Sequence, residues 1–227
     1  QSRRNLDALV GLGSAKDEFN ALVTEAKVGQ QRKAAGLPAP KPTMHLVFTG
    51  NPGTGKTTVA EELGKSYKAM GLIPTDKFTV ATRADLVGQY AGHTAAKVRK
   101  AFNDSKGGVL FVDEAYGLVN GDNDSFGFEA VDELVAQSEA NRDNTVVILA
   151  GYPEDMDRLM TANPGLKSRF PKTIAFPDYS EDELKEISSR NSVTSGYQYT
   201  PQGRMAVATV MQKIRSAPNY SNARDVR

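Results

Sequence analysis

Short hydrophobic runs alternate along the chain with longer stretches in which apolar residues recur every three or four positions. Runs rich in β-branched and aromatic residues predict strands, and the helical spacing between them predicts helices. Two of the runs, 109–112 and 146–150, are apolar throughout, which is typical of strands buried on both faces of a parallel sheet. We expect strands at 45–49, 78–81, 109–112, 146–150 and 173–176.

Helical stretches separate the predicted strands. Phe19 and Leu22 belong to one apolar helix face ahead of the first run, and Val59 and Leu63 belong to another directly after it. Strands and helices that alternate in this way predict a parallel sheet with helices packed on both faces. We therefore expect residues 1–177 to form a large α/β domain, a three-layer sandwich around a five-stranded parallel sheet.

The pattern changes after the fifth run, where helical signals follow without a further strand. Ser180 and Glu183 have the spacing of a capping box, and Pro201 is expected at the first position of another helix. We expect residues 178–227 to form a small helical subdomain. Residues 221–227 resemble the beginning of a helix without its end, so we expect this subdomain to be truncated at its C-terminal end, in a chain taken from a longer protein.

The chain carries 28 lysines and arginines against 27 aspartates and glutamates, a net charge of +1. This balance provides no overall field that would gather nucleic acid or anionic lipid. Cysteine is absent and His45 and His93 are the two histidines, which excludes disulfides, thiolate catalysis and cysteine- or histidine-rich metal sites. No apolar run approaches the roughly 18 residues of a membrane span. We expect a cytoplasmic protein.

Residues 50–57 match the phosphate-binding pattern G-x-x-x-x-G-K-[ST] at every fixed position and lie between a predicted strand and a predicted helix. Glycine lets the backbone N–H groups of such a loop turn toward phosphate oxygens, and the following helix N-terminus adds positive potential. Lys56 would reach the β- and γ-phosphates, and the Thr57 hydroxyl would bind Mg²⁺. We expect a nucleotide to be bound by Pro52, Gly53, Thr54, Gly55, Lys56, Thr57 and Thr58.

Two carboxylates follow the apolar run 109–112. Asp113 and Glu114 would stand at the carboxyl edge of the sheet, where open α/β sheets bind ligands. In a chain that also has a phosphate-binding loop, we expect Asp113 to hold the Mg²⁺ shell and Glu114 to orient and activate the attacking water. The two motifs together predict binding and hydrolysis of a nucleoside triphosphate.

With these motifs the chain resembles the AAA+ superfamily of P-loop ATPases. More narrowly, it is similar to the group that contains the red-type Rubisco activase CbbX, the type VII secretion ATPase EccA and the sporulation protein SpoVK. The resemblance runs in order from about Leu6 to Arg227 and implies ATP and Mg²⁺ as ligands, with the C-terminal helices forming a lid. The segments that carry it are 6–12, 48–58, 86–94, 107–116, 148–152, 163–170 and 176–179.

The resemblance also implies roles for residues outside the two motifs. Val10 and Gly11 would line an adenine pocket. Arg169 would be an arginine finger that reaches the γ-phosphate of a neighbouring subunit. Arg224 would contact phosphate from the lid at the sensor-2 position. Tyr90, in a glycine-flanked loop, would line a central pore and grip a threaded peptide by packing.

Plainer alternatives stay open for these residues: helix-entry packing for Val10 and Gly11, a solvated surface arginine for Arg169, and a tyrosine packed in a turn for Tyr90. Many AAA+ proteins carry a polar sensor-1 residue after the fourth strand. Residues 150–153 here read Ala-Gly-Tyr-Pro, so the sequence leaves open which residue positions water opposite the catalytic carboxylate.

The preferred interpretation is an ATP-hydrolysing ring motor, homohexameric or hetero-oligomeric, that remodels a protein client or threads it through a central pore. The alternative is a nucleic-acid-directed AAA+ ATPase of the clamp-loader or helicase-loader type, which the near-zero net charge and the aromatic loop at Tyr90 disfavour. A nucleotide-dependent interaction module without turnover would not need Lys56, Asp113 and Glu114 together. The client and its pathway stay open at this level.

Overall fold

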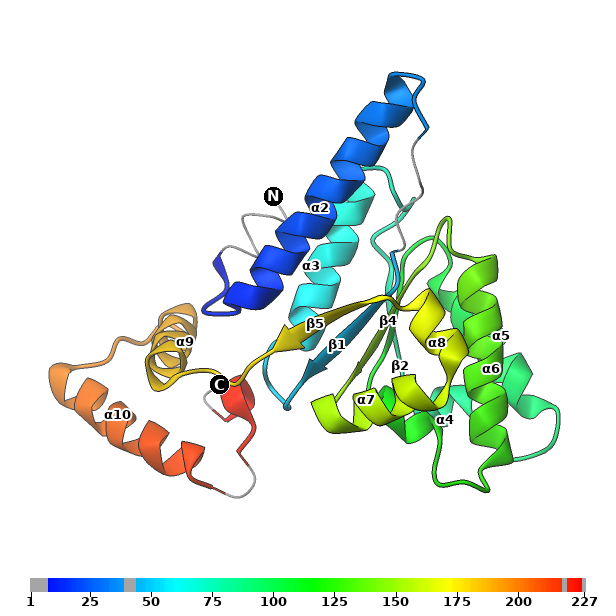
Figure 1. The fold of residues 1–227 in the computed structure, drawn as a ribbon. Coiled ribbons are helices and arrows are strands. Elements are labelled where there is room, and N and C mark those ends of the chain that lie inside the picture. The colour runs from blue at the N-terminus through cyan, green and yellow to red at the C-terminus, as the bar shows by residue number, and fades with distance from the viewer. Residues whose placement is uncertain (1–7, 39–43, 218–219, 226–227) are drawn as a thin grey trace.

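The computed structural model describes residues 8–38, 44–217 and 220–225 (Figure 1). Leu6 and Arg227, at the two ends of the family resemblance, lie outside these residues. In chain order the elements are α2 (Gly13–Ala34), β1 (Leu46–Gly50), α3 (Lys56–Ala69), β2 (Phe78–Ala81), α4 (Arg83–Leu86), α5 (His93–Ser105), β3 (Val109–Val112), the 3₁₀ turn η1 (Ala115–Leu118), α6 (Ser125–Ala140), β4 (Val146–Gly151), α7 (Pro153–Ala162), α8 (Pro164–Arg169), β5 (Lys172–Phe176), α9 (Glu181–Thr194), α10 (Pro201–Arg215) and the 3₁₀ turn η2 (Asn222–Arg224).

The strands form one parallel five-stranded sheet in the order β2-β3-β4-β1-β5. β1 lies between β4 and β5, with Leu46 opposite Ile148 of β4 on one side and Lys172 of β5 on the other. β3 and β4 are buried at every residue, whereas the edge strand β2 leaves Val80 half exposed. The expected α/β sandwich is confirmed, and each predicted strand matches an observed one to within one residue at either end.

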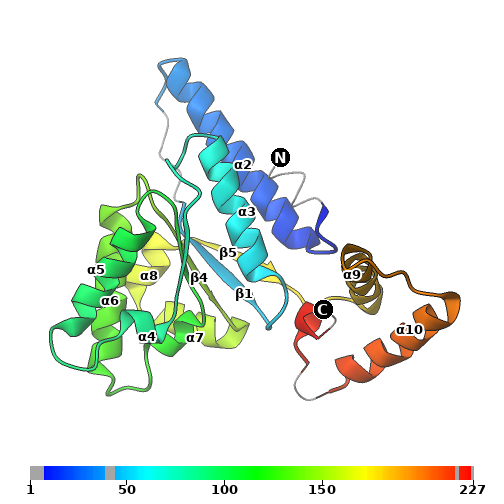
Figure 2. The same ribbon diagram turned by 180° about the vertical axis from the view of Figure 1, so that it is seen from behind.

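Alternate residues of the strands supply two hydrophobic layers, one on each face of the sheet. Leu46 and Phe48 of β1 pack in the layer that contains Phe19 of α2 and Leu63 of α3. Val47, between them, belongs to the opposite layer with the buried residues of α5, α6, α7 and α8. Figure 1 and its reverse view, Figure 2, show the two sets of helices on either side of the strands.

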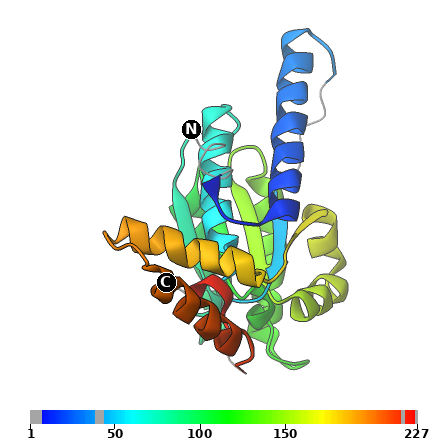
Figure 3. The same cartoon turned by 90° about the vertical axis from the view of Figure 1, so that its left-hand side faces the viewer.

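The C-terminal helices gather at the end of the sheet where β1 and β5 finish (Figure 3). α9 begins with the predicted capping box, in which Ser180 Oγ accepts from Glu183 N at 3.3 Å and a Glu183 carboxylate oxygen accepts from Ser180 N at 2.7 Å. α10 begins at Pro201, as predicted. The helix expected over 221–227 is instead a 3₁₀ turn at Asn222–Arg224, and the final two residues lie outside the described part of the chain.

Among the described residues, no helix combines the length and the apolar composition needed to cross a membrane.

Candidate active site

The phosphate-binding loop connects the end of β1 at Gly50 to the start of α3 at Lys56. Gly53 and Gly55 have left-handed backbone angles, with φ of +72° and +91°, which glycine adopts without the steric cost of a Cβ. A Cβ on Gly53 would also lie 1.9 Å from the carbonyl oxygen of Ser221. Glycine is therefore required at that position both by the turn and by the close approach of the C-terminal segment.

The ammonium group of Lys56 is held within this loop. Its Nζ donates to the carbonyl oxygens of Gly50 at 2.6 Å and Asn51 at 2.8 Å. Burial lowers the pKa of Lys56, the charge of Asp113 opposes this shift, and the guanidinium of Arg224 adds to it. Two cations that face one another across a site favour a ligand with several negative charges.

β3 delivers two carboxylates to the same end of the sheet. The backbone N–H of Asp113 donates to Ala81 O at 2.9 Å, which extends the pairing of β3 with β2 by one residue. Glu114 has a left-handed backbone, with φ of +49°, an uncommon conformation for a residue with a side chain. The chain therefore turns sharply at Glu114, and this side chain is exposed at the edge of the site.

A cavity of about 450 Å³ opens at this end of the sheet, between the loop and the C-terminal turn η2. The Thr57 hydroxyl and the Asp113 carboxylate both face it, and these are hard oxygen ligands of the kind that Mg²⁺ takes, so the donor set fits a Mg²⁺–nucleotide complex. The structure brings together the predicted residues Pro52, Gly53, Thr54, Gly55, Lys56, Thr57, Thr58, Asp113, Glu114 and Arg224 in the wall of this cavity.

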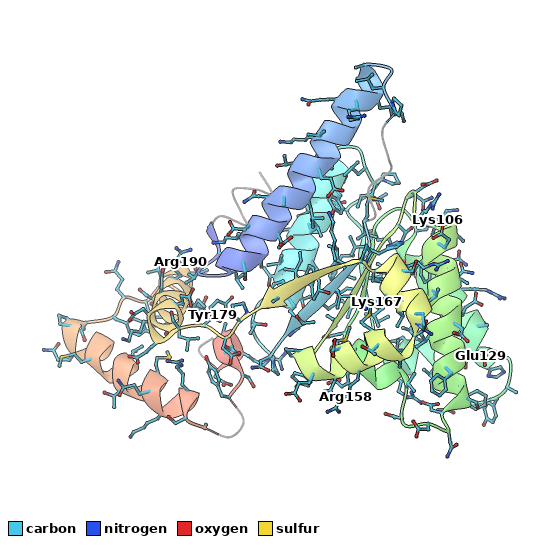
Figure 4. The ribbon with its side chains drawn as sticks, viewed as in Figure 1. Lys106, Glu129, Arg158, Lys167, Tyr179 and Arg190 are labelled. Atoms are coloured by element: carbon cyan, nitrogen blue, oxygen red, sulfur yellow. The ribbon has the colours of Figure 1, made fainter. Side chains whose placement is uncertain are left out.

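A second cavity of about 250 Å³ adjoins the first, because Gly53, Gly55 and Thr58 line both of them. Its walls are mostly apolar, as the flat faces of a nucleobase require. They include Val10, Leu12, Tyr179, Ile187 and Ala223. Figure 4 shows Tyr179 between α9 and the end of β5. The two cavities form one elongated site, polar at the phosphate-binding loop and mostly apolar at Val10 and Tyr179.

Val10 and Gly11 stand at this apolar half. Val10 is buried and lines the second cavity. Gly11 has a left-handed φ of +62°, and a Cβ there would lie 2.2 Å from Glu183 Oε1. Gly11 thus allows α9 to approach the N-terminal segment, and it is not among the described residues that line the cavity.

Four further residues line the first cavity without a role in the sequence interpretation. They are Glu61, Tyr116, Gly151 and Tyr152. The rings of Tyr116 and Tyr152 lie 5.4 Å apart, and burial together with the charge of Glu114 raises the pKa of Tyr116 to about 12. The Tyr116 hydroxyl therefore stays protonated at neutral pH. The sequence indicates Tyr116 and Tyr152 only through their positions: Tyr116 follows β3 and Tyr152 follows β4, two strands that end at the same edge of the sheet.

Arg169 and Tyr90 lie outside both cavities. Arg169 ends α8, and its Nε is buried without a hydrogen-bond partner in the described structure, 3.7 Å from Glu139 Oε2. Figure 4 marks its neighbour Lys167 on the side of the molecule away from α9. Tyr90 is 67% exposed in the loop between α4 and α5, where its ring meets His93 edge-on at 5.5 Å. The structure therefore does not bring these two residues into the chain's own nucleotide site.

A phosphate-binding loop after β1, an Asp-Glu pair at the end of the buried strand β3, and a parallel sheet in which β4 lies between these two strands define a P-loop nucleoside triphosphatase. The sequence pattern described as "ATPase family associated with various cellular activities (AAA)" matches residues 46–178, from the first residue of β1 to the segment after β5. The chain belongs to this family and is an ATPase.

Several relatives match nearly the whole chain, among them two bacterial proteins with different names. Protein CbbX of Cereibacter sphaeroides is 42% identical over 220 residues, which cover 96% of this chain and 71% of that protein. Stage V sporulation protein K of Bacillus subtilis is 41% identical over 227 residues, 99% of this chain and 70% of the relative. Among solved structures, the FIGL-1 AAA domain in complex with ADP has a TM-score of 0.64 at 17% identity, over 97% of this chain and 69% of that one. This last likeness is one of fold.

Proposed function

We propose that the chain is a Mg²⁺-dependent ring motor that uses ATP hydrolysis to remodel a protein client. The observation that carries this proposal is that the predicted catalytic residues do not all lie in one place. The phosphate loop, both carboxylates and Arg224 share one cavity, whereas Arg169 ends α8 and does not line that cavity. A site that is complete except for its arginine finger is the arrangement expected when a neighbouring subunit supplies that finger.

Within one subunit, each group of the cavity has a distinct task. Lys56 neutralises the β- and γ-phosphates, and Arg224 adds a second cation from the lid side. Thr57 and Asp113 would hold Mg²⁺, which screens the phosphate charges when bound. Glu114 orients and activates the attacking water, and the protonated Tyr116 hydroxyl lies on the same wall as a hydrogen-bond donor. The apolar cavity at Val10 takes the adenine.

A finger that acts in trans requires a heterologous interface, which either closes into a ring or grows as a filament. We propose a closed ring, most simply a homohexamer, with residues 1–177 as the large domain and 178–227 as the lid. The exposed Tyr90 would face the pore and grip an extended peptide through its ring, without reading sequence. Movement of the lid during the ATP cycle would then shift this loop and pull on the client.

The proposal is tested by measuring the ATPase rate against protein concentration, with the mass determined by light scattering in the same samples, with and without ATP. We expect the specific activity to rise steeply as a six-subunit species forms. If a monomer hydrolysed ATP at a rate independent of protein concentration, the ATPase activity would be confirmed and the ring would be refuted. A salt-sensitive shift of DNA by the same samples would favour a nucleic-acid client instead.

A further inference from the structure

Three consecutive carbonyl groups of the phosphate-binding loop, those of Pro52, Gly53 and Thr54, accept hydrogen bonds from the C-terminal part of the chain. Asn222 Nδ2 donates to Pro52 O at 3.2 Å, and Ala223 N donates to Gly53 O at 3.2 Å. The hydroxyl of Tyr179 donates to Thr54 O at 3.4 Å. Three consecutive peptide groups of the loop are thereby held from the lid side.

This arrangement determines where the N–H groups of the loop point. In a planar trans peptide the N–H lies opposite to the preceding C=O. When the carbonyls of Pro52, Gly53 and Thr54 face η2 and Tyr179, the N–H groups of the residues that follow them face the other way. Those N–H groups are the donors that a phosphate-binding loop offers to its ligand.

Asn222 is the centre of this contact. It is fully buried, and its backbone is left-handed, with φ of +53°. Besides its bond to Pro52 O, its Nδ2 donates to Asp178 Oδ1 at 2.9 Å, and its Oδ1 accepts from Tyr179 N at 3.0 Å. Asp178 in turn accepts from the side chain of Asn51 at 2.9 Å and 3.1 Å. The buried amide therefore has a partner for each donor and for its acceptor.

These residues join three segments that are far apart in the sequence. Asn51 and Pro52 belong to the loop, Asp178 and Tyr179 follow β5, and Asn222 lies in η2. Apolar packing of Tyr179 and Ala223 in the core anchors this region, and the hydrogen bonds fix the direction in which the loop carbonyls point. A side chain that is buried, polar and fully satisfied specifies one arrangement, because any other leaves its groups unpaired.

We propose that Asn222 is a positioning residue for the β-phosphate of a bound nucleoside diphosphate or triphosphate. It acts through the loop: by holding the Pro52 carbonyl on the lid side, it aims the neighbouring backbone N–H groups at the phosphate. The inference rests on the proposed nucleotide site and adds a specific dependence. Affinity for nucleotides with a β-phosphate depends on Asn222, and affinity for the nucleoside monophosphate does not.

The experiment compares the dissociation constants of ADP and AMP by calorimetry. Asn222→Gly keeps the left-handed backbone and removes the amide. Asn222→Asp keeps the shape and the acceptor but replaces the two donor contacts with a carboxylate that faces Pro52 O and Asp178. For both variants we expect ADP binding to weaken about fivefold or more, the effect of one or two lost hydrogen bonds, and AMP binding to change less than about twofold.

The matched control is Ser188→Ala, which removes a partly buried hydrogen bond inside the lid, between Ser188 Oγ and the Tyr199 hydroxyl at 2.9 Å, without touching the loop. It should leave the ADP-to-AMP ratio at the wild-type value. Equal weakening of ADP and AMP by the Asn222 variants, no change in either, or the same ratio shift in Ser188→Ala would overturn the proposal. If the ATPase were a monomer with a concentration-independent rate, the ring would be refuted. The comparison of ADP and AMP affinities would still test the role of Asn222.

Discussion

Arg83 and Asp124 form an ion pair of 2.7 Å that ties α4, the helix ahead of the Tyr90 loop, to the start of α6. The same Arg83 nitrogen donates to Gly117 O at 3.1 Å and to Leu118 O in η1, the turn that follows Glu114. One guanidinium, on the helix that leads into the Tyr90 loop, therefore contacts both the turn after Glu114 and the start of α6.

Asp124 is expected to be important for stability. It accepts from Arg83, from Asn120 N at 2.8 Å and, as the N-cap of α6, from Gly127 N at 2.9 Å. We expect Asp124→Ala to lower the free energy of unfolding at pH 7 by about 2–3 kcal/mol, through the lost cap and the lost charged hydrogen bonds. Urea unfolding measures this. Asp122→Ala, at an exposed position of the same loop, is the control and should change stability little.

The ion pair between Asp124 and Arg83 makes the contribution of Asp124 to stability depend on pH. The Arg83 guanidinium, with the backbone N–H groups of Asn120 and Gly127, lowers the pKa of Asp124 from 3.8 to about 2. Because the folded protein binds this proton less readily than the unfolded chain, the stabilisation is complete above pH 4 and is lost as the pH falls toward 2. The stability difference between wild type and Asp124→Asn should shrink over that range. A constant difference would contradict the assignment.

His45 predicts a second pH dependence, nearer neutrality. Its ring is buried, with Nε2 at 2.9 Å from Ser138 O and Nδ1 accepting from Val147 N at 3.1 Å, which requires the neutral tautomer protonated at Nε2. Burial lowers its pKa below 6.5. Stability should therefore be complete above pH 6.5 and fall as the pH drops below it, since the unfolded chain takes up the proton first. The free energy of unfolding should keep its dependence on pH in His93→Gln, at the exposed histidine. In His45→Gln that dependence should become weaker.

The sequence was sufficient for the strands, the phosphate loop and the start of α9, because each depends on local spacing or on a local hydrogen bond. It was insufficient for α4, a single turn whose capping box joins Thr82 to Asp85 and carries no hydrophobic period. It was also insufficient for contacts such as Asn222 to Pro52, since no periodicity links two residues that are 170 positions apart in the sequence. The residues that complete the cavity wall, Tyr116 and Tyr152, follow only from knowing which strands are neighbours.

Lys56→Ala should weaken ATP and ADP binding about 100-fold or more, because it removes the cation that the loop holds toward the phosphates and leaves Asp113 unopposed. Calorimetric titration measures this directly. Lys65→Ala is the control: this lysine lies on the same helix, is exposed and pairs with Glu62, and the variant should bind ATP as the wild type does. If Lys56→Ala bound ATP with unchanged affinity, residues 50–57 would not be the phosphate-binding loop.

Glu114→Gln should retain ATP binding and reduce turnover about 100-fold or more. The amide keeps the size and the left-handed turn of Glu114 but cannot accept a proton from the attacking water. Single-turnover hydrolysis with radiolabelled ATP separates binding from chemistry. Normal turnover in this variant would assign the base elsewhere on the cavity wall, with Glu61 as the next carboxylate to substitute.

Arg169 allows the sharpest test of the ring, because the Glu114→Gln and Arg169→Ala variants fail for different reasons. Glu114→Gln subunits keep the finger and lose the base, whereas Arg169→Ala subunits keep the base and lose a finger worth about 10³-fold or more in rate. Each should be nearly inactive alone. When they are mixed before assembly, an Arg169→Ala pocket beside a Glu114→Gln neighbour is complete, so activity should recover to about a quarter of the wild-type rate for random pairing. Arg158→Ala, at an exposed arginine of α7, should be active by itself. If the mixture stays as inactive as its components although light scattering shows joint rings, Arg169 does not act across the interface.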